Sequence, residues 1–321
     1  MITSMFTLTD HLLQEEGSVT GTTESLTHVI STIEDAAKMI ADQVRVLGLA
    51  QLSGKTGRVN PFGEEVQKLD LFANQLLVDR LLMSGVVYAV VSEELEQPVF
   101  APPLQAREYI VYIDPIDGSS NIDINGPTGT IFSIYRRVGG FLQQGVKQVA
   151  CGYVMYGPSV MFVYTRGNGV HGFTLDHAEN RFLYSHPALS LPAKANIYSV
   201  NEAYETLYDR RTRAYLALLR ASADYTARYT GSLVADGHRT LLKGGLFLYP
   251  PNQKQPEGKL RLMLEVNPFA FLIEQAGGKA IGSDGKSPLT IRPETVHDRA
   301  SLVMGSRDNV DLFASFLKQS F

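Results

Sequence analysis

The fold of this chain is decided by the stretch YIVYIDPIDGSSN, which covers residues 109–121. Its first five residues are apolar, β-branched or aromatic, which is typical of a buried strand. That strand ends on Asp114 and Asp117, and Gly118 with two serines is typical of a turn into a helix start. Hard cations prefer carboxylate oxygens, and the free N–H groups of a helix start bind anions. The stretch therefore indicates metal-assisted phosphoryl chemistry.

Composition sets the class of protein. The chain has 321 residues, of which 44% are hydrophobic and 19% charged, as in ordinary globular proteins. Its net charge of −4 argues against general affinity for nucleic acid. The single cysteine, Cys151, excludes an intramolecular disulfide and indicates a reducing compartment. We find no signal-peptide pattern and no apolar run of about 18 residues, so we expect a cytoplasmic protein without a membrane span; a processed organellar protein would share these features.

Apolar spacing predicts alternating helices and strands. Residues 1–23 are polar, with a mobile start expected, and no element is predicted there. A helix is predicted over residues 24–49, a loop over 51–63 and a helix over 64–82. Strands are predicted at 86–91, 109–113, 131–136, 149–155 and 160–164, before a connection at 187–194. Further along we predict strands at 197–200, 246–249 and 302–304, helices at 207–219, 231–242, after 267 and at 309–317, and extended chain at 259–265. This alternation predicts stacked layers of helix and sheet.

Acidic side chains follow two of the predicted strands. Glu93 and Glu94 come just after one, and Asp114 and Asp117 end the other. If these strands are neighbours, four carboxylates converge, and such like charges repel unless cations neutralise them. Taken alone, the first pair is more typical of a solvated loop than of a functional site.

A basic pair lies in the second half of the chain. Lys259 and Arg261 would share one face of an extended segment, where arginine grips a phosphate with two hydrogen bonds and lysine acts as a point charge. Period-two spacing places Glu265 on the same face, so a purely solvated basic edge is a poorer interpretation.

Competing phosphate motifs fail on spacing. Five residues separate Gly48 from the Gly54-Lys55-Thr56 run, where a nucleotide P-loop needs four. A phosphoaspartate phosphatase needs acids two apart after its first strand, whereas here they are three apart.

The seven histidines show no HExxH pattern, so each is interpreted as a surface or core residue. Cys151 is interpreted as a core residue.

Along nearly its whole length the chain resembles class I fructose-1,6-bisphosphatase, of the lithium-sensitive sugar and inositol phosphatase superfamily. The matching segments are 63–70 (GEEVQKLD), 92–94 (SEE), 114–123 (DPIDGSSNID), 129–136 (GTIFSIYR), 198–202 (YSVNE), 227–236 (ARYTGSLVAD), 238–240 (HRT), 246–250 (LFLYP) and 258–262 (GKLRL), with Glu265, Asn267 and Pro268. The resemblance implies an α/β (α+β layered) fold, the five-layer αβαβα sugar-phosphatase fold with two mixed sheets. It also implies a metal-binding and allosteric half at 1–188 and a sugar-phosphate-binding half at 189–321.

The resemblance also implies roles for individual residues. The ligands of two or three Mg²⁺ ions, with Mn²⁺ as a substitute, would be Glu93, Asp114, Asp117, Glu265, the carbonyl of Ile116, and Glu64, which stands where the family has Asp. Asp70 and Glu94 would polarise the attacking water. The phosphoryl group being lost would contact Gly118, Ser119, Ser120 and Arg261. The other phosphate would contact Asn201, Tyr204, Tyr229 and Tyr249, with Arg228 reaching it in a neighbouring subunit of a homotetramer, and Lys259 would contact the sugar.

The implied activity is hydrolysis of the 1-phosphate of fructose 1,6-bisphosphate to fructose 6-phosphate by metal-activated water, a step of gluconeogenesis. Sedoheptulose 1,7-bisphosphate is the alternative substrate. A non-catalytic sugar-phosphate sensor is the alternative of another class, and retention of six acids argues against it. In the family's AMP site, Tyr109 and Arg136 match, Glu108 replaces a lysine, and residues 21–27 carry a shifted turn; an acid facing the AMP phosphate would cost affinity.

Overall fold

A computed structural model describes residues 6–16, 23–49, 52, 54–59, 65–102 and 107–319. The helices are α1 (Leu8–Glu15), α2 (Glu24–Arg45), α3 (Lys68–Met83), α4 (Arg210–Ala221), α5 (Leu233–Lys243), α6 (Asn267–Gln275) and α7 (Arg307–Leu317). The strands of the first half are β1 (Lys55–Val59), β2 (Glu65–Gln67), β3 (Val87–Ser92), β4 (Val99–Phe100), β5 (Tyr109–Asp117), β6 (Thr128–Arg136), β7 (Gln148–Tyr156), β8 (Val160–Thr165), β9 (His171–Asp176) and β10 (Arg181–His186). Those of the second half are β11 (Ile197–Ser199), β12 (Thr226–Ala227), β13 (Leu246–Tyr249), β14 (Leu260–Arg261), β15 (Lys279–Ile281), β16 (Arg299–Ala300) and β17 (Leu302–Gly305).

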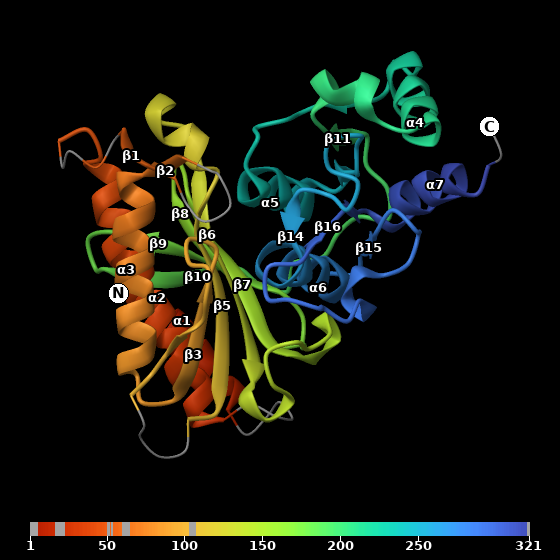
Figure 1. Ribbon diagram of the computed structural model, residues 1–321. Helices are drawn as coiled ribbons and strands as arrows, with labels where there is room; N and C mark the ends of the chain where they lie inside the picture. Colours follow the sequence, from red (N-terminus) through yellow and green to blue (C-terminus); the bar gives the residue numbers. More distant parts are fainter. Residues whose placement is uncertain are drawn as a thin grey trace.

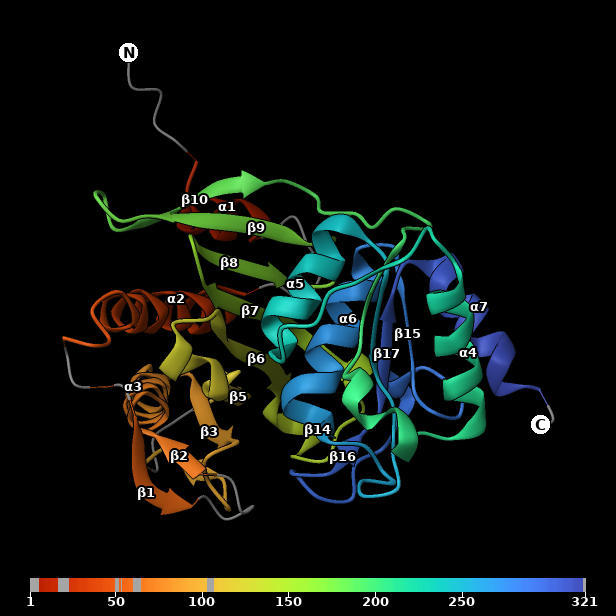
Figure 2. The same cartoon turned by 90° about the horizontal axis from the view of Figure 1, so that it is seen from above.

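Two mixed sheets form the frame of the molecule. The larger has the order β10-β9-β8-β7-β6-β5-β3-β4, and the smaller has the order β12-β11-β13-β17-β15. Helices α1, α2 and α3 cover the outer face of the larger sheet, α5 and α6 lie between the sheets, and α4 and α7 cover the outer face of the smaller one (Figures 1 and 2). This confirms the predicted five-layer αβαβα fold with two mixed sheets.

Each buried layer has its own apolar core. One cluster joins the first three helices to the larger sheet, a second fills the space between the sheets, and a third lies under α4 and α7. The middle cluster combines Tyr112 and Tyr153 of the larger sheet with Phe269 of α6, so the two halves of the chain share a core. Within the described ranges, no helix is long and apolar enough to cross a membrane.

Strand β5 is an interior strand of the larger sheet, third from its β4 edge, and carries the decisive stretch. All nine of its residues are buried, as expected for a strand covered on both faces. It pairs in parallel with β3, so Ser92 lies opposite Ile113 and the two strands end at the same edge. The predicted convergence of the acids that follow these strands is therefore confirmed.

Three local predictions were wrong. Residues 1–23 contain a helix, α1, whose Thr7 cap accepts from the Asp10 N–H while Leu8 and Leu12 are buried. The predicted loop at 51–63 contains β1, which pairs with β2, so the following helix begins at Lys68 and not at 64. The predicted extended segment 259–265 is β14 followed by a π-helical turn, Leu262–Val266. The hairpin β9–β10 and strand β15 were not predicted.

Candidate active site

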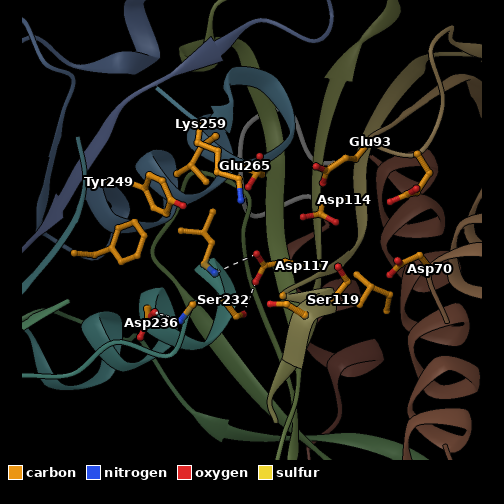
Figure 3. A pocket seen from close by; sticks show the side chains of 18 of the residues that line it. Asp70, Glu93, Asp114, Asp117, Ser119, Ser232, Asp236, Tyr249, Lys259 and Glu265 are labelled. Atoms are coloured by element: carbon orange, nitrogen blue, oxygen red, sulfur yellow. Dashed lines mark hydrogen bonds between the residues drawn. The ribbon is translucent and has the colours of Figure 1, made fainter. Parts of the chain in front are cut away.

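A cavity of 340 Å³ lies between the sheets, where β3 and β5 end (Figure 3). The predicted site residues that line it are Asp70, Glu93, Glu94, Asp114, Ile116, Asp117, Gly118, Ser119, Ser120, Tyr229, Tyr249, Lys259 and Glu265. Figure 3 shows the acids turned toward one another, with Tyr249 on the opposite side of the cavity. Glu64 lies outside the described residues.

A break in strand pairing brings the two aspartates of the decisive stretch to one side. Residues three apart on a regular strand point to opposite faces. The register of β5 against β6 shifts between Asp114 and Asp117, and the hydroxyl of Thr130 donates to the Pro115 carbonyl at 2.7 Å. Such a bulge re-aims side chains, and here both carboxylates face the cavity.

The start of α5 holds the carboxylate of Asp117 in place. The N–H groups of Leu233 and Val234 donate to it at 3.1 and 2.7 Å, and the Ser232 hydroxyl donates as well. A helix N-terminus favours negative charge, so α5 stabilises ionised Asp117. No role was predicted for Ser232; its only local signal is a serine before an apolar helical run, and its partner lies 115 residues away.

Glu265 reaches the cluster through the π-helical turn. Its carboxylate accepts the N–H of Arg261 at 2.6 Å, and the Arg261 guanidinium lies 3.0 Å from the Glu93 carboxylate. Glu265 and Arg261 therefore do lie together, as predicted. The predicted reason, a shared face of one extended strand, was wrong, because the π-helical turn brings them together. Arg261 itself is buried, pairs with Glu93 and is not among the residues lining the cavity.

Burial of clustered carboxyl groups dominates the electrostatics of the site, and repulsion between them adds to it. Oxygens of Asp114, Asp117 and Glu265 all lie within 4.8 Å of one another. Burial raises the pKa of Asp117 to about 6 and that of Glu265 to about 8, and Glu93 adds repulsion to both. The pKa of Asp114 also rises well above its usual range, through burial and then repulsion from its acidic neighbours. An all-oxygen donor set held together against repulsion fits hard divalent cations.

Gly118 sits where the chain leaves β5 for a short 3₁₀ helix, Ser119–Ile124. Its φ of +76° is one that residues with a Cβ rarely adopt, and an added Cβ would lie 2.6 Å from the Cβ of Ser232. A side chain here would therefore push Ser232 away from Asp117.

We expect Gly118→Ala to destabilise the chain by more than the roughly 1–2 kcal/mol that positive φ alone costs. Gly85→Ala is the matched control, because Gly85 has φ +82° with open space around it. Urea unfolding of both variants measures the difference, and equal losses would contradict a steric role for the contact with Ser232.

The acids predicted to polarise water lie on the α3 side of the cavity. Asp70 lies in the first turn of α3, where its carboxylate accepts the Gln67 N–H at 2.8 Å, and it is buried. Glu94 follows β3, and its N–H donates to the Ser92 hydroxyl at 3.2 Å. Both line the cavity beside the acidic cluster, as Figure 3 shows for Asp70.

Tyrosines form the other end of the cavity. Burial raises the pKa of both Tyr229 and Tyr249 to about 12, so both phenols keep their protons and can donate to an anion. Asn201 hydrogen-bonds Tyr229, and Tyr204 is a near neighbour of Tyr249, although neither lines the cavity.

Two further residues lie close to Tyr229 in the chain, one of them exposed and the other buried. Arg228 is exposed, points its guanidinium at the Ala227 carbonyl and does not line the cavity of its own chain. Asp236, which the sequence interpretation missed, is fully buried and accepts the N–H groups of Thr230 and Gly231 at 3.0 and 3.1 Å. That bonding fixes the loop between Tyr229 and α5.

Comparison with known proteins gives concordant matches. The family Fructose-1-6-bisphosphatase, N-terminal domain, matches residues 6–187, and the corresponding C-terminal domain matches residues 191–318. Fructose-1,6-bisphosphatase class 1 of Persephonella marina is 48% identical over 95% of this chain and 96% of its own length. The protein of that name from Sulfurihydrogenibium sp. is 46% identical over 97% of each chain.

A solved structure matches in shape as well. The holo form of Leishmania major fructose-1,6-bisphosphatase superposes with a TM-score of 0.93 at 36% identity, over 98% of this chain and 100% of the other. The T-state of the same enzyme gives a TM-score of 0.88 at 35% identity, over 98% of both chains.

Proposed function

Because this chain belongs to the class 1 fructose-1,6-bisphosphatase family and is thus a phosphoric monoester hydrolase, we propose that it removes the 1-phosphate of fructose 1,6-bisphosphate. The observation that carries the proposal is the cavity itself, with clustered acids at one end and protonated tyrosines at the other. One end suits divalent cations and the other suits a second phosphate, so a bisphosphate satisfies both.

We propose that Glu93, Asp114, Asp117, Glu265 and the Ile116 carbonyl hold Mg²⁺, with Mn²⁺ as a substitute. Bound divalent cations lower the pKa of water and screen phosphoryl charge. The family is metal-dependent, and the crowded carboxylates of this chain fit that requirement. Glu64 keeps its proposed part in this set, since a longer carboxylate still ligates.

The chain's own groups then orient the reactants. Asp70 and Glu94 flank the cluster and would accept a proton from the attacking water. Ser119 and Ser120, which follow Gly118, line the cavity, and we propose that their N–H groups bind the departing phosphoryl group. Arg261 balances Glu93 and would turn toward the phosphoryl oxygens when cations take over that carboxylate.

The substrate assignment is tested by a rate panel. Phosphate release is measured from fructose 1,6-bisphosphate, sedoheptulose 1,7-bisphosphate and inositol monophosphate, each with and without Mg²⁺. We expect the fructose ester to be hydrolysed fastest and only with the metal. A faster sedoheptulose ester would transfer the proposal to that sugar, and equal rates on inositol phosphate would refute a bisphosphatase. Tight binding without phosphate release would indicate a sensor.

Lys259 offers a specific test of sugar binding. It lies exposed at the rim of the cavity, just before β14, where we propose that its ammonium contacts the substrate. We expect Lys259→Gln to raise KM about tenfold, because a charge-assisted hydrogen bond is worth about 1.5–3 kcal/mol. Lys254→Gln, a nearby exposed lysine that does not line the cavity, is the matched control and should leave KM unchanged. Equal KM values for the two variants would contradict the contact.

Assembly and regulation follow the same proposal. The exposure of Arg228 supports a homotetramer in which it reaches a neighbouring cavity.

Glu108 lies 3.4 Å from Arg136 and accepts the Ser25 hydroxyl at 3.0 Å, which supports weak AMP binding because the acid already neutralises that arginine. The metal-binding and sugar-phosphate roles of the two halves, the gluconeogenic role and the cytoplasmic location stay predictions.

A further inference from the structure

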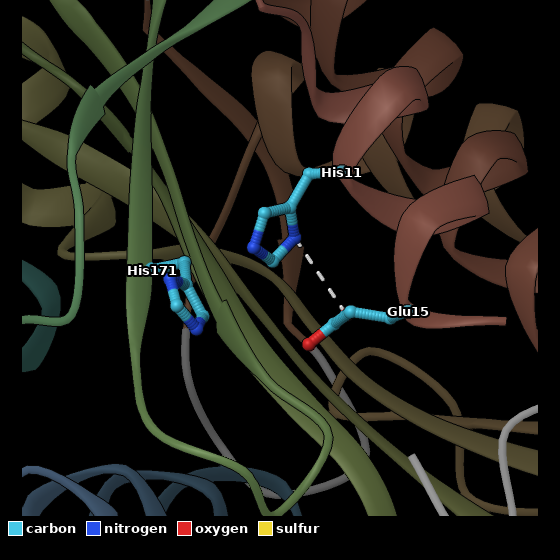
Figure 4. A group of neighbouring side chains, drawn as sticks. All are labelled: His11, Glu15 and His171. Atoms are coloured by element: carbon cyan, nitrogen blue, oxygen red, sulfur yellow. Dashed lines mark ion pairs between the residues drawn. The ribbon is translucent and has the colours of Figure 1, made fainter. Parts of the chain in front are cut away.

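A second group of metal-ligand side chains lies far from the cavity, where α1 packs against the larger sheet. His11 and Glu15 lie one turn apart on α1, and His171 begins β9 (Figure 4). One ligand atom of each lies within 4.8 Å of those of the other two. The centroids of the two imidazole rings are 4.4 Å apart, and the ring planes are tilted by 50°. None of these three residues belongs to the acidic cluster of the cavity.

Tyrosine hydroxyls already orient each of these side chains. The Tyr164 hydroxyl lies 2.6 Å from Nδ1 of His11 and donates to Glu15 at 2.9 Å. The Tyr184 hydroxyl lies 2.6 Å from Nδ1 of His171. In metal sites an imidazole ligand usually bonds such a partner through its other nitrogen, which fixes the ring and its tautomer. The Ala188 N–H also lies 3.4 Å from Nδ1 of His171, and the Glu15 carboxylate lies 3.6 Å from Nδ1 of His11. With Nδ1 occupied in both rings, Nε2 is the atom that each would offer to a metal, with His171 in the tautomer that donates from Nδ1 to Tyr184.

Burial keeps the first imidazole ready to ligate. His11 and Glu15 are each 7% exposed. Burial, with His171 and Arg166 nearby, lowers the pKa of His11 to about 4, so the ring is neutral at neutral pH and keeps a lone pair. The guanidinium of Arg166 lies 3.7 Å from Glu15 and balances its charge when no cation is present.

We propose that His11, Glu15 and His171 form a Zn²⁺ site that fastens α1 to the larger sheet. Two imidazoles and one carboxylate are a recurrent zinc donor set, and three protein ligands leave a position for water. Imidazole nitrogen suits zinc and disfavours Mg²⁺, so the site would be chemically separate from the all-oxygen cavity.

Cobalt provides a direct spectroscopic probe of this site. The metal-stripped full chain is titrated with Co²⁺ while excess Mg²⁺ occupies the acidic cavity. We expect one equivalent to bind with the visible absorption bands of low-coordinate Co²⁺, and Zn²⁺ to displace it and raise the melting temperature. His171→Ala should weaken binding by at least about 100-fold, and Tyr184→Phe by about tenfold through loss of orientation. His177→Ala, on the exposed β9–β10 turn, is the matched control and should bind normally.

Three outcomes would overturn the site: no visible bands, bands that persist in both His11→Ala and His171→Ala, or bands that vanish in Asp117→Asn, which would assign the signal to the cavity. Circular dichroism verifies the fold of each variant. Should His171→Ala not fold, Tyr184→Phe, which keeps the ring and its packing, decides the matter through its affinity.

Discussion

Replacing Asp117 by asparagine lowers the turnover of fructose 1,6-bisphosphate by about 10³-fold or more and leaves the chain folded. The substitution removes one negative charge from the oxygens that lie within 4.8 Å of one another. It also puts an amide NH₂ where a carboxylate oxygen accepts the Val234 N–H and the Ser232 hydroxyl. The asparagine keeps one oxygen for the start of α5, so the helix retains an acceptor while the cation site loses a ligand.

Phosphate release under saturating Mg²⁺ measures this effect, and circular dichroism verifies the fold. Asp79→Asn is the matched control, since Asp79 is an exposed aspartate of α3 whose carboxylate accepts only from the Gln75 side chain among the described contacts. The control should retain full turnover. Near-normal turnover in Asp117→Asn would contradict the proposed role of Asp117 as a metal ligand.

Stripping divalent cations makes the contribution of the acidic cluster to the stability of this protein fall as pH rises from about 4 to about 8. Glu265 and Asp117 have folded pKa values raised to about 8 and about 6, above the ordinary 4.5 and 3.8. Between those limits these two carboxyl groups bind more protons in the folded state than in the unfolded state, so at this cluster rising pH favours unfolding. Below about pH 4 both carboxyl groups are protonated in the folded and in the unfolded state. Above about pH 8 both are ionised in the folded state, so their mutual repulsion no longer changes with pH.

Thermal unfolding of the metal-free and Mg²⁺-loaded protein at about pH 5 and pH 8 tests this expectation. Each pKa unit corresponds to about 1.4 kcal/mol, and 1 kcal/mol shifts the melting temperature of a chain of this size by roughly 2–4 °C. We therefore expect Mg²⁺ to raise the melting temperature by several degrees at pH 8 and by much less at pH 5. Asp114→Asn, which removes one repelling charge, should flatten the pH dependence of the metal-free protein. A metal effect that is equal at both pH values would contradict the crowding of charge.

The central acid motif could be predicted because its information is local. A run of buried strand residues ending on two acids and a glycine specifies a strand and a turn within a dozen residues, whereas the bulge between Asp114 and Asp117 was not predicted. Its meeting with Glu93 was predicted only on the condition that the two strands are neighbours, which the pairing of β3 with β5 satisfies. Family resemblance supplied the roles at the second end of the cavity, which no spacing in this sequence reveals.

The remaining features depend on contacts between distant segments. Glu265 meets Arg261 through a π-helical turn that no periodicity predicted. Helix α1 is two turns long, and its two buried leucines are too few to signal a helix. The histidines could not be recognised as a pair, because His11 and His171 are brought together only by the packing of α1 on the sheet.

The most direct test of the central claim is anomalous scattering from crystals soaked with Mn²⁺, measured with the same crystals' phosphate release from fructose 1,6-bisphosphate. We predict strong anomalous peaks enclosed by Asp114, Asp117 and Glu265, with Glu93 beside them, and turnover only when those peaks are present. Turnover by crystals that show no anomalous density at this cluster would contradict the account.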